Sequence, residues 1–319
     1  KHRRRQRQMC IRDSHKAFAF LPDHHHLTAL SASRQTAAVK IEVAGSAKID
    51  TPLILQFTDG KTDEASHPFV FIDIADSAHL HLAELHEGEP SLSQPLILVR
   101  LGQGATLDHI KLQDEAAHTT HLGLTLFRLD GQANVNSFSV SKGSQITRME
   151  THCFFAAPDA QAAMSAVYLG CDRQHHDITT VVSHEYADCK SRQLIRGVLD
   201  DKARGVFQGR VRVAPDAQKT DGQQMSRALL LSRDAEADAK PELEIFADDV
   251  VCSHGATVGE LDETLLFYLK SRGIDEAEAR TMLIDAFLVD TLEEISYQPF
   301  ADFLRGQVSG WTARQTGVE

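Results

Sequence analysis

The sequence predicts a mainly β protein that forms a parallel β-helix, or solenoid, followed by a small C-terminal α-helical domain. Between Ile41 and Val250 the chain is dominated by short runs in which apolar residues alternate with polar ones. Small residues recur in the same region at an almost constant spacing. Beyond Gly259 the apolar residues instead follow the period of an α-helix.

Alternating runs mark the expected strands. Successive side chains of a strand point to opposite faces, so each run should bury one face and expose the other. No long helical period interrupts these runs before Gly259. In chain order, their apolar positions are Ile41/Val43, Leu53/Leu55, Leu80/Leu82, Leu122/Leu124/Leu126, Val135 with Phe138/Val140, Val211/Val213 and Leu243/Ile245.

Small turn residues predict how the strands are connected. When the chain is aligned on them, successive spacings are 27, 28, 29, 27, 28 and 30 residues by subtraction. Such even spacing is typical of a solenoid, in which each coil buries its apolar face only against its neighbours. An antiparallel β-sandwich is the alternative, but Asp130–Gly131 and Asp221–Gly222 are the main hairpin candidates. The aligned residues are Ala78, Ala105, Ala133, Ala162, Cys189, Ala217 and Ala247.

Two helices are expected directly after the strands. Asp262 can cap the first helix, and Gly273 sits where a left-handed residue would end it. Asp275 and Glu278 form a capping-box-like start for the second helix. The first helix carries Leu265, Leu266 and Leu269, and the second should bury one face made of Ala279, Met282, Leu283, Ala286 and Phe287.

A last helix is expected after Pro299, with an apolar pattern that includes Phe300 and Leu304. The chain then divides into three parts. Residues 1–37 are expected to be poorly ordered, and we interpret residues 1–14 as non-native because this block is strongly basic at its start and does not begin with Met. Residues 38–258 form the β-helix core, and residues 259–319 form the helical domain.

Composition narrows the classes of function. The 319 residues carry a net charge of -12 at pH 7, which opposes binding to nucleic acid or to an anionic membrane. The five cysteines are widely spaced, so neither a disulfide framework nor a zinc ribbon is expected. No apolar run approaches the roughly 20 residues of a membrane helix, and no export signal is visible. We therefore expect a cytoplasmic protein with no nucleic-acid and no membrane partner.

Cys252 and His254 are the leading candidates for metal ligands. They follow the alternating run that ends at Ala247 and should point the same way if the strand persists. Two ligands are too few for a four-coordinate zinc or iron–sulfur site, so further ligands would have to come from elsewhere, for example another subunit. The alternative interpretation is a half-buried thiol beside a hydrogen-bonded turn histidine.

Weaker candidates come from other histidines and from acidic pairs. His176 and His184 could contact a metal, although a structural role is the default for both. A β-helix enzyme that acts on carbohydrates could use Asp200–Asp201 or Asp248–Asp249, but adjacent strand residues face opposite ways and make a poor joint site. The chain has no phosphate-binding loop of the G-x-x-x-x-G-K-[ST] type, so we expect it to bind no nucleotide.

Several short segments, which follow one another in the second half of the chain, carry a family resemblance. In order, they are Ile195-Arg196-Gly197, Ala203-Arg204-Gly205-Val206-Phe207, Ala217-Gln218-Lys219-Thr220-Asp221, the acidic strand from Leu243 to Val250, Cys252-Ser253-His254-Gly255-Ala256-Thr257 and Leu266-Phe267-Tyr268-Leu269. Together they resemble the SufB/SufD family of iron–sulfur cluster assembly scaffold proteins, and its SufD branch more than its SufB branch. Where SufB carries a cysteine-bearing segment, this chain has Leu229-Leu230-Leu231-Ser232.

The resemblance implies a fold and a role. It implies a right-handed parallel β-helix, which agrees with the repeat, and a SufD-like scaffold subunit without catalytic activity of its own. SufB would pair with the β-helix, although the isolated chain could form a homodimer. A SufB-like scaffold that itself nucleates clusters is the main alternative.

The resemblance also assigns residues to partners. Cys252 and His254 match positions implicated in the family as ligands or relay groups, here for a transient iron–sulfur cluster or iron shared with SufB. The C-terminal helices would hold SufC, the ATPase that hydrolyses ATP for the complex. The residues expected at the SufC contact are Leu265, Leu266, Tyr268 and Arg272.

Overall fold

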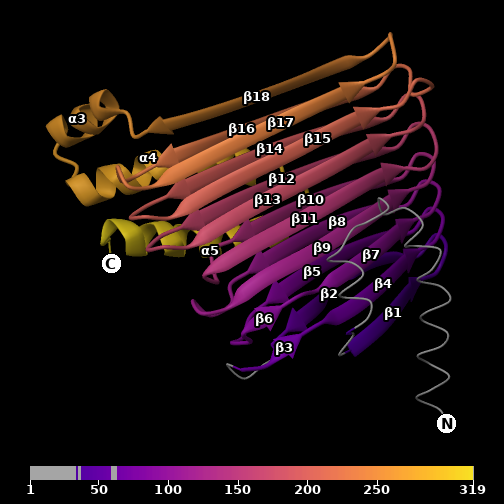
Figure 1. The fold of residues 1–319 in the computed structure, drawn as a ribbon, viewed down its shortest axis with the longest axis horizontal. Helices are drawn as coiled ribbons and strands as arrows, with labels where there is room; N and C mark the ends of the chain where they lie inside the picture. Colours follow the sequence, from indigo (N-terminus) through magenta and orange to yellow (C-terminus); the bar gives the residue numbers. More distant parts are fainter. Residues whose placement is uncertain (1–33, 35–36, 59–62, 319) are drawn as a thin grey trace.

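The structure is a computed structural model that describes residues 34, 37–58 and 63–318. Two parallel sheets wind around a common interior as a solenoid of about 8 turns, and three helices follow (Figure 1). This arrangement confirms the predicted parallel β-helix and C-terminal helices. The predictions made for residues 1–14, and for residues 1–37 apart from Arg34 and Ala37, fall outside the described residues.

Sheet A contains ten strands, of which eight follow one another along the solenoid and two short ones lie beside this path. All of its pairings are parallel. The main path runs through β1 (Ala37–Val43), β4 (Pro68–Ile74), β7 (Leu96–Leu101), β9 (Thr120–Leu129), β11 (Ile146–Phe155), β13 (His175–His184), β15 (Arg204–Val213) and β17 (Glu236–Ile245); the short strands are β3 (Ala65–Ser66) and β6 (Leu92–Ser93).

Sheet B supplies the other wall of each coil, and its eight strands are also parallel. Its inner side chains meet those of sheet A in an apolar interior that includes Leu80, Phe127 and Val211. The strands are β2 (Lys48–Phe57), β5 (His79–His86), β8 (Thr106–Gln113), β10 (Asn134–Ser141), β12 (Gln161–Gly170), β14 (Lys190–Leu199), β16 (Asp221–Leu230) and β18 (Val251–Glu260).

The corner before each sheet B strand explains the sequence repeat. Before every sheet B strand except β18, one residue there adopts a left-handed conformation, and a small buried residue follows it in most coils. The carbonyl of that small residue accepts a hydrogen bond from the next coil, as Ala105 O does from Asn134 N at 2.8 Å. The left-handed residues are Ser46, Ser77, Gly104, Gln132, Asp159, Asp188 and Lys219.

Three positions in the predicted alignment are wrong. The residue directly before β12 is Ala160, not Ala162, and β16 and β18 are preceded by Thr220 and Val250. The corners differ in length, because four residues separate β9 from β10 while seven separate β15 from β16. A small residue near a corner therefore marks each coil only to within a few residues.

Three helices complete the described chain, and the predicted N-caps Asp262 and Asp275 are confirmed for the first two. They are α3 (Glu263–Ser271), α4 (Glu276–Leu292) and α5 (Gln298–Thr316). The carboxylate of Asp262 accepts from the backbone N–H groups of Thr264 and Leu265, which caps α3. Asp275 accepts from Ala277 N at the start of α4. Gly273 has a φ of 86°, as expected for a left-handed residue after a helix. No described helix is long and apolar enough to span a membrane.

Helices α4 and α5 pack on the outer face of sheet B, where they cover apolar side chains such as Ile110, Phe138 and Val167. The predicted buried face of α4 is partly wrong, because Met282 is 45% exposed and the residues that reach the sheet include Ile284 and Leu288. Each of them directly follows a predicted residue, Leu283 or Phe287. One position along an α-helix corresponds to a rotation of about 100°, so the buried stripe is shifted by this angle from the predicted one.

Phe287 belongs to the intramolecular contact that the sequence predicts for it. It packs at the edge of the cluster formed by sheet B and the helices, and the Arg196 guanidinium lies 4.9 Å from the centre of its ring. Such a cation–π contact contributes about 0.5–1 kcal/mol at a partly exposed site. The helical segment therefore packs against the outer face of sheet B.

Candidate functional site

Cys252 and His254 lie on β18, the last strand of sheet B (Figure 1). The register pairs Cys252 with Gly222 and His254 with Gln224, and both of these β16 residues are buried. Both candidates therefore face the interior of the solenoid at its final turn, as the alternation of the sequence predicts. No strand follows β18 in the described chain, so this turn forms an open end.

Glycine at position 222 gives the Cys252 thiol room beneath the strand. A Cβ at this position would lie 3.2 Å from Cys252 Sγ and 3.7 Å from Ser191 Oγ, closer than most side chains tolerate in the first case. Ser191 in turn hydrogen-bonds Nε2 of His184 at 2.9 Å. Cys252 thus lies directly above Gly222, and Ser191 is the next residue in the same row of the sheet.

Two glutamine side chains stack below His254. Gln224 Nε2 donates to Gln193 Oε1 at 3.3 Å, and Thr180 Oγ1 donates to the same oxygen at 2.5 Å. Gln224 Oε1 and Gln193 Nε2 are buried and make no hydrogen bond. The imidazole of His254 is exposed, so this row of polar side chains, Gln193, Gln224 and His254, ends at the protein surface.

Burial controls the chemistry of the Cys252 thiol. Desolvation raises its pKa above the ordinary value, and the charge of Asp221 acts in the same direction. At neutral pH the thiol is therefore protonated in the isolated chain. A thiolate is needed to bind a metal, so a cation placed at the open end would have to displace this proton.

The described part of the chain supplies only two ligands at this end. The described groups of three or more histidine, cysteine or acidic side chains close enough to share a metal include neither Cys252 nor His254. A thiolate and an imidazole leave at least two coordination positions of a tetrahedral ion unfilled. The geometry suits a site that another molecule completes.

The open end also exposes backbone and apolar surface. Strands β17 and β18 each have one neighbour in their sheets, so one edge of each strand lacks a partner in the described chain. Unpaired edges of ten-residue strands are a template for another chain. Four large apolar side chains lie exposed there, Ile245 at 39%, Phe246 at 59%, Val251 at 69% and Val258 at 48%.

His176 and His184 do not join this site. Both side chains point from β13 into the interior of the solenoid, where each is fully buried. They stand eight residues apart on one strand, a separation of about 26 Å at the usual rise per residue. His176 Nδ1 hydrogen-bonds Ser141 Oγ at 2.8 Å, and His184 stacks against Phe155 with ring centres 4.5 Å apart. The two histidines cannot bind one ion together.

Helix α3 presents most of the side chains predicted for the SufC contact. Leu265 is 50% exposed and Tyr268 is 52% exposed, and the Arg272 guanidinium lies 5.1 Å from the centre of the Tyr268 ring. Phe267, which was not among the predicted residues, is 73% exposed. Leu266 is buried and anchors the helix, so it does not belong to the exposed surface.

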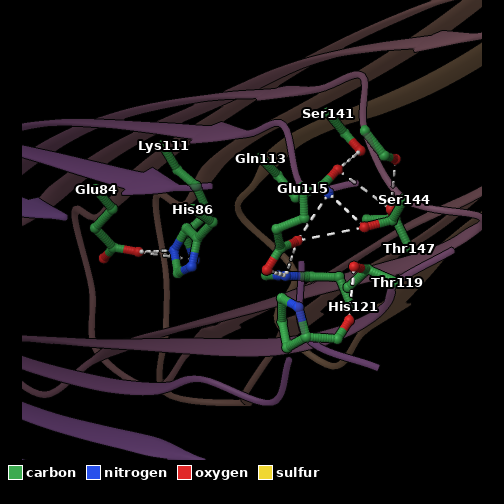
Figure 2. A network of polar contacts seen from close by, with 12 residues as sticks. Glu84, His86, Lys111, Gln113, Glu115, Thr119, His121, Ser141, Ser144 and Thr147 are labelled. Carbon is green, nitrogen blue, oxygen red and sulfur yellow. Dashed lines mark hydrogen bonds and ion pairs between the residues drawn. The ribbon is translucent and has the colours of Figure 1, made fainter. Parts of the chain in front are cut away.

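A polar network occupies part of the interior, around β5, β8 and β11 (Figure 2). The Glu84 carboxylate is fully buried between Lys111 Nζ at 3.1 Å and Nε2 of His109 at 3.1 Å. Burial opposes ionisation of Glu84, but the Lys111 and His109 charges outweigh it and hold its pKa well below the ordinary value. A paired buried charge of this kind is destabilising to break.

A second carboxylate in the same interior belongs to Glu115. Nδ1 of His121 lies 2.8 Å from Glu115 Oε2, and Gln113 Nε2 donates to the same oxygen at 2.9 Å (Figure 2). Burial opposes its ionisation, but His121 outweighs this effect and lowers the pKa of Glu115. His86, whose ring packs edge-on against His121, has its pKa lowered to about 4 by burial. His86, Glu115 and His121 come close enough to share a metal ion.

Sequence reasoning did not find this interior network or a second cluster, His79, His81 and Asp108, on the outer face of sheet B. A signal for the second cluster exists. His79 and His81 alternate on a strand, and Asp108 follows His81 by 27 residues, which is one coil of the repeat.

Comparison with known proteins decides the family. Residues 56–287 match the family model described as the SUF system FeS cluster assembly, SufBD core domain. This match covers most of the solenoid, β18, α3 and part of α4. The chain belongs to the SufBD family. Members of this family are iron–sulfur cluster assembly proteins, which agrees with the resemblance seen in the sequence.

Curated relatives of the SufD type are similar to this chain. The iron–sulfur cluster assembly protein SufD of Escherichia coli is 33% identical over 250 residues, which cover 76% of this chain and 59% of that protein. Protein ABCI7, chloroplastic, of Arabidopsis thaliana is 30% identical over 282 residues, 85% of this chain and 59% of its own length. SufD of Bacillus subtilis is 26% identical, with 64% of its length covered. The chain therefore spans about 60% of the length of these relatives.

We predict that the buried histidines make the fold sensitive to mild acid. Burial lowers the pKa of His176 and of His184 to about 3, so each is neutral in the folded chain, whereas an unfolded histidine titrates near 6.5. Their contribution to stability is complete above pH 6.5 and is lost as pH falls toward 3. Each should reduce the free energy of unfolding by up to about 1.4 kcal/mol per pH unit in this window.

Urea unfolding at several pH values between 7 and 4.5 measures this effect. The free energy of unfolding of the His184→Gln variant should fall less steeply with decreasing pH than that of the wild type. The difference between the two slopes should correspond to about one bound proton. The exposed residue His118 provides the control, since His118→Gln should leave the slope unchanged. Equal slopes for wild type and His184→Gln would contradict the prediction.

Proposed function

We propose that this chain is a SufD-like, non-catalytic scaffold subunit for iron–sulfur cluster assembly that pairs with SufB and docks the ATPase SufC. The observation that carries the proposal is the position of Cys252 and His254. They belong to a chain of the SufBD family and share the inner face of the final strand at an open end. They offer too few ligands for a complete metal site.

Pairing with SufB through the open end would satisfy two physical needs. Backbone N–H and C=O groups on the free edges of β17 and β18 would gain partners, as in other cases where a strand adds to a sheet edge. The exposed apolar side chains around Phe246 and Val251 would be removed from water, at about 25 cal/mol per Å² of apolar area. In the isolated chain, a second copy could occupy the same end.

Iron or a nascent cluster is the cargo of the proposed shared site. Thiolate binds iron well, and imidazole can replace thiolate as a cluster ligand. The high pKa of the Cys252 thiol means that binding releases a proton, so a weakly held ligand can be given up when the partner moves. This behaviour suits transfer of the cluster to another protein more than permanent storage.

SufC is proposed to dock on α3. The exposed side chains of Leu265, Phe267 and Tyr268 form an apolar surface on this helix, and Arg272 lies over the Tyr268 ring. Apolar and aromatic side chains together with arginine are typical of the residues that dominate protein interfaces. ATP hydrolysis would occur in SufC, and the cytoplasm remains the compartment that we predict.

Cluster assembly in the reconstituted complex tests the shared site. The chain is purified with SufB and SufC from the same genome, and clusters are formed anaerobically from iron and sulfide and followed by visible absorbance. We expect Cys252→Ala and His254→Ala to form the complex but to lower its affinity for iron about tenfold or more, by removal of a ligand.

Ser253→Ala is the matched control, because Ser253 lies on the same strand and points to the opposite face. It should assemble clusters as the wild type does. If Cys252→Ala and His254→Ala also matched the wild type, the assignment of the site would be wrong while the scaffold role could stand. Failure to form any complex with SufB would overturn the role itself.

Docking of SufC is tested separately by calorimetry with purified SufC. We expect Tyr268→Ala to weaken binding about tenfold or more, as for an aromatic side chain at the centre of an interface. Ile146→Ser is the control, since Ile146 is 44% exposed but lies on β11, in sheet A. Unchanged affinity of Tyr268→Ala would move the SufC contact away from α3.

A further inference from the structure

His79, His81 and Asp108 form a cluster on the outer face of sheet B. His79 and His81 belong to β5, and the register places His81 beside Asp108 of β8. The residues between them, such as Leu80, point into the interior, so all three polar side chains point outward. The cluster lies beneath the segment that joins α4 to α5, on a different face from Cys252.

The distances in this cluster are close to those around a bound metal ion. His79 Nε2 lies 2.8 Å from Asp108 Oδ2, and His81 Nδ1 lies 3.1 Å from the same oxygen. One ligand atom from each residue fits within 4.8 Å of the other two. A tetrahedral ion with bonds of about 2.0–2.2 Å separates neighbouring ligand atoms by about 3.3–3.6 Å. A metal would therefore require only small movements of these side chains.

A second set of contacts orients the Asp108 carboxylate. Its other oxygen, Oδ1, accepts from Ser296 Oγ at 2.5 Å and from Asn136 Nδ2 at 3.1 Å. Oδ2 is thereby left facing the two imidazoles. Metal-binding carboxylates are commonly held in this way by a neighbouring donor.

His81 supplies a buried nitrogen beside the Asp108 carboxylate. The residue is 8% exposed, and Nδ1 makes no hydrogen bond although it lies 3.1 Å from Asp108 Oδ2. Its ring stacks on Tyr297 with centres 3.8 Å apart, which fixes its orientation. The nitrogen that faces the Asp108 carboxylate is therefore held in place for a cation.

We propose that His79, His81 and Asp108 bind a divalent transition-metal ion, such as Zn²⁺ or Fe²⁺. Two imidazoles and one carboxylate suit these ions better than Mg²⁺ or Ca²⁺, which prefer oxygen ligands throughout. The His79 side chain is 37% exposed, so water can reach the ion and fill its remaining positions. The site contains no thiol and does not depend on the proposed role in cluster assembly.

A bound ion would also stabilise the contact between the helical segment and the β-helix. Ser296 and Tyr297 precede α5 and contact Asp108 and His81, so the ion would order the side chains on which this segment rests. A ligand that binds only the folded chain raises its stability in proportion to the logarithm of its concentration. Metal binding should therefore appear both as a spectroscopic change and as a rise in Tm.

The test uses the full chain with competing ligands removed. His24, His25 and His26 are replaced by Ala and Cys252 by Ser, because the histidine tract and the thiol could each bind the same ions. The metal-free protein is titrated with Co²⁺, followed by its visible absorption, and with Zn²⁺ in competition with a chromogenic chelator. Tm is recorded at each metal concentration.

We expect this background protein to bind one ion and to gain Tm. Asp108→Asn and His79→Gln should each lower the affinity about tenfold or more and abolish the gain in Tm. His79→Gln is the decisive variant if Asp108→Asn folds poorly, since His79 is partly exposed. His118→Gln is the matched control, because His118 is exposed and lies outside the cluster, and it should bind as the background protein does.

Two results would overturn the proposal. The first is a background protein that binds no ion, in which case the three side chains only tether the segment between α4 and α5. The second is equal binding by the background protein and His79→Gln, which would place the ion elsewhere. Neither result bears on SufB pairing or on Cys252, so the two proposals fail independently.

Discussion

The parallel ladder between successive coils is the constraint on which the rest of the structure depends. Each coil forms its backbone hydrogen bonds and buries its inner side chains only against its neighbours. The last coil must therefore leave backbone groups unpaired and side chains exposed on one side. The free edges and the exposed apolar side chains follow from this one fact, and Cys252 and His254, the proposed ligands, lie at the same end. A solenoid that ends without a cap has a binding surface built into its architecture.

The two proposed metal sites differ in their ligands and lie in separate parts of the fold. The open end offers a thiol and an imidazole on a strand edge, a set suited to iron and sulfide but incomplete without a partner. The outer face of sheet B offers imidazoles and a carboxylate, already oriented by Ser296 and Asn136. In our proposals, another chain completes the first set, whereas the second set binds an ion with water in the remaining positions. Their separation lets each be altered without the other.

Much of the fold, but less of the site, could be predicted from the sequence. Alternation and a near-constant period indicate the coils, and alternation alone places Cys252 and His254 on one face. The buried face of α4 was missed because a period of 3.6 residues permits two adjacent stripes, and only the shape of sheet B selects Ile284 over Leu283. The outer cluster was missed because its ligands come from different coils, and their register had to be known first.

Amide hydrogen exchange, measured for the chain alone and in complex with SufB, tests the central claim most directly. If SufB pairs with the open end, exchange should slow in the final strands, Glu236–Ile245 and Val251–Glu260, because their edges gain hydrogen bonds. The strands of the first coil, Ala37–Val43 and Lys48–Phe57, should be unchanged. A complex that protects the first coil and leaves the last coil exchanging freely would contradict the account.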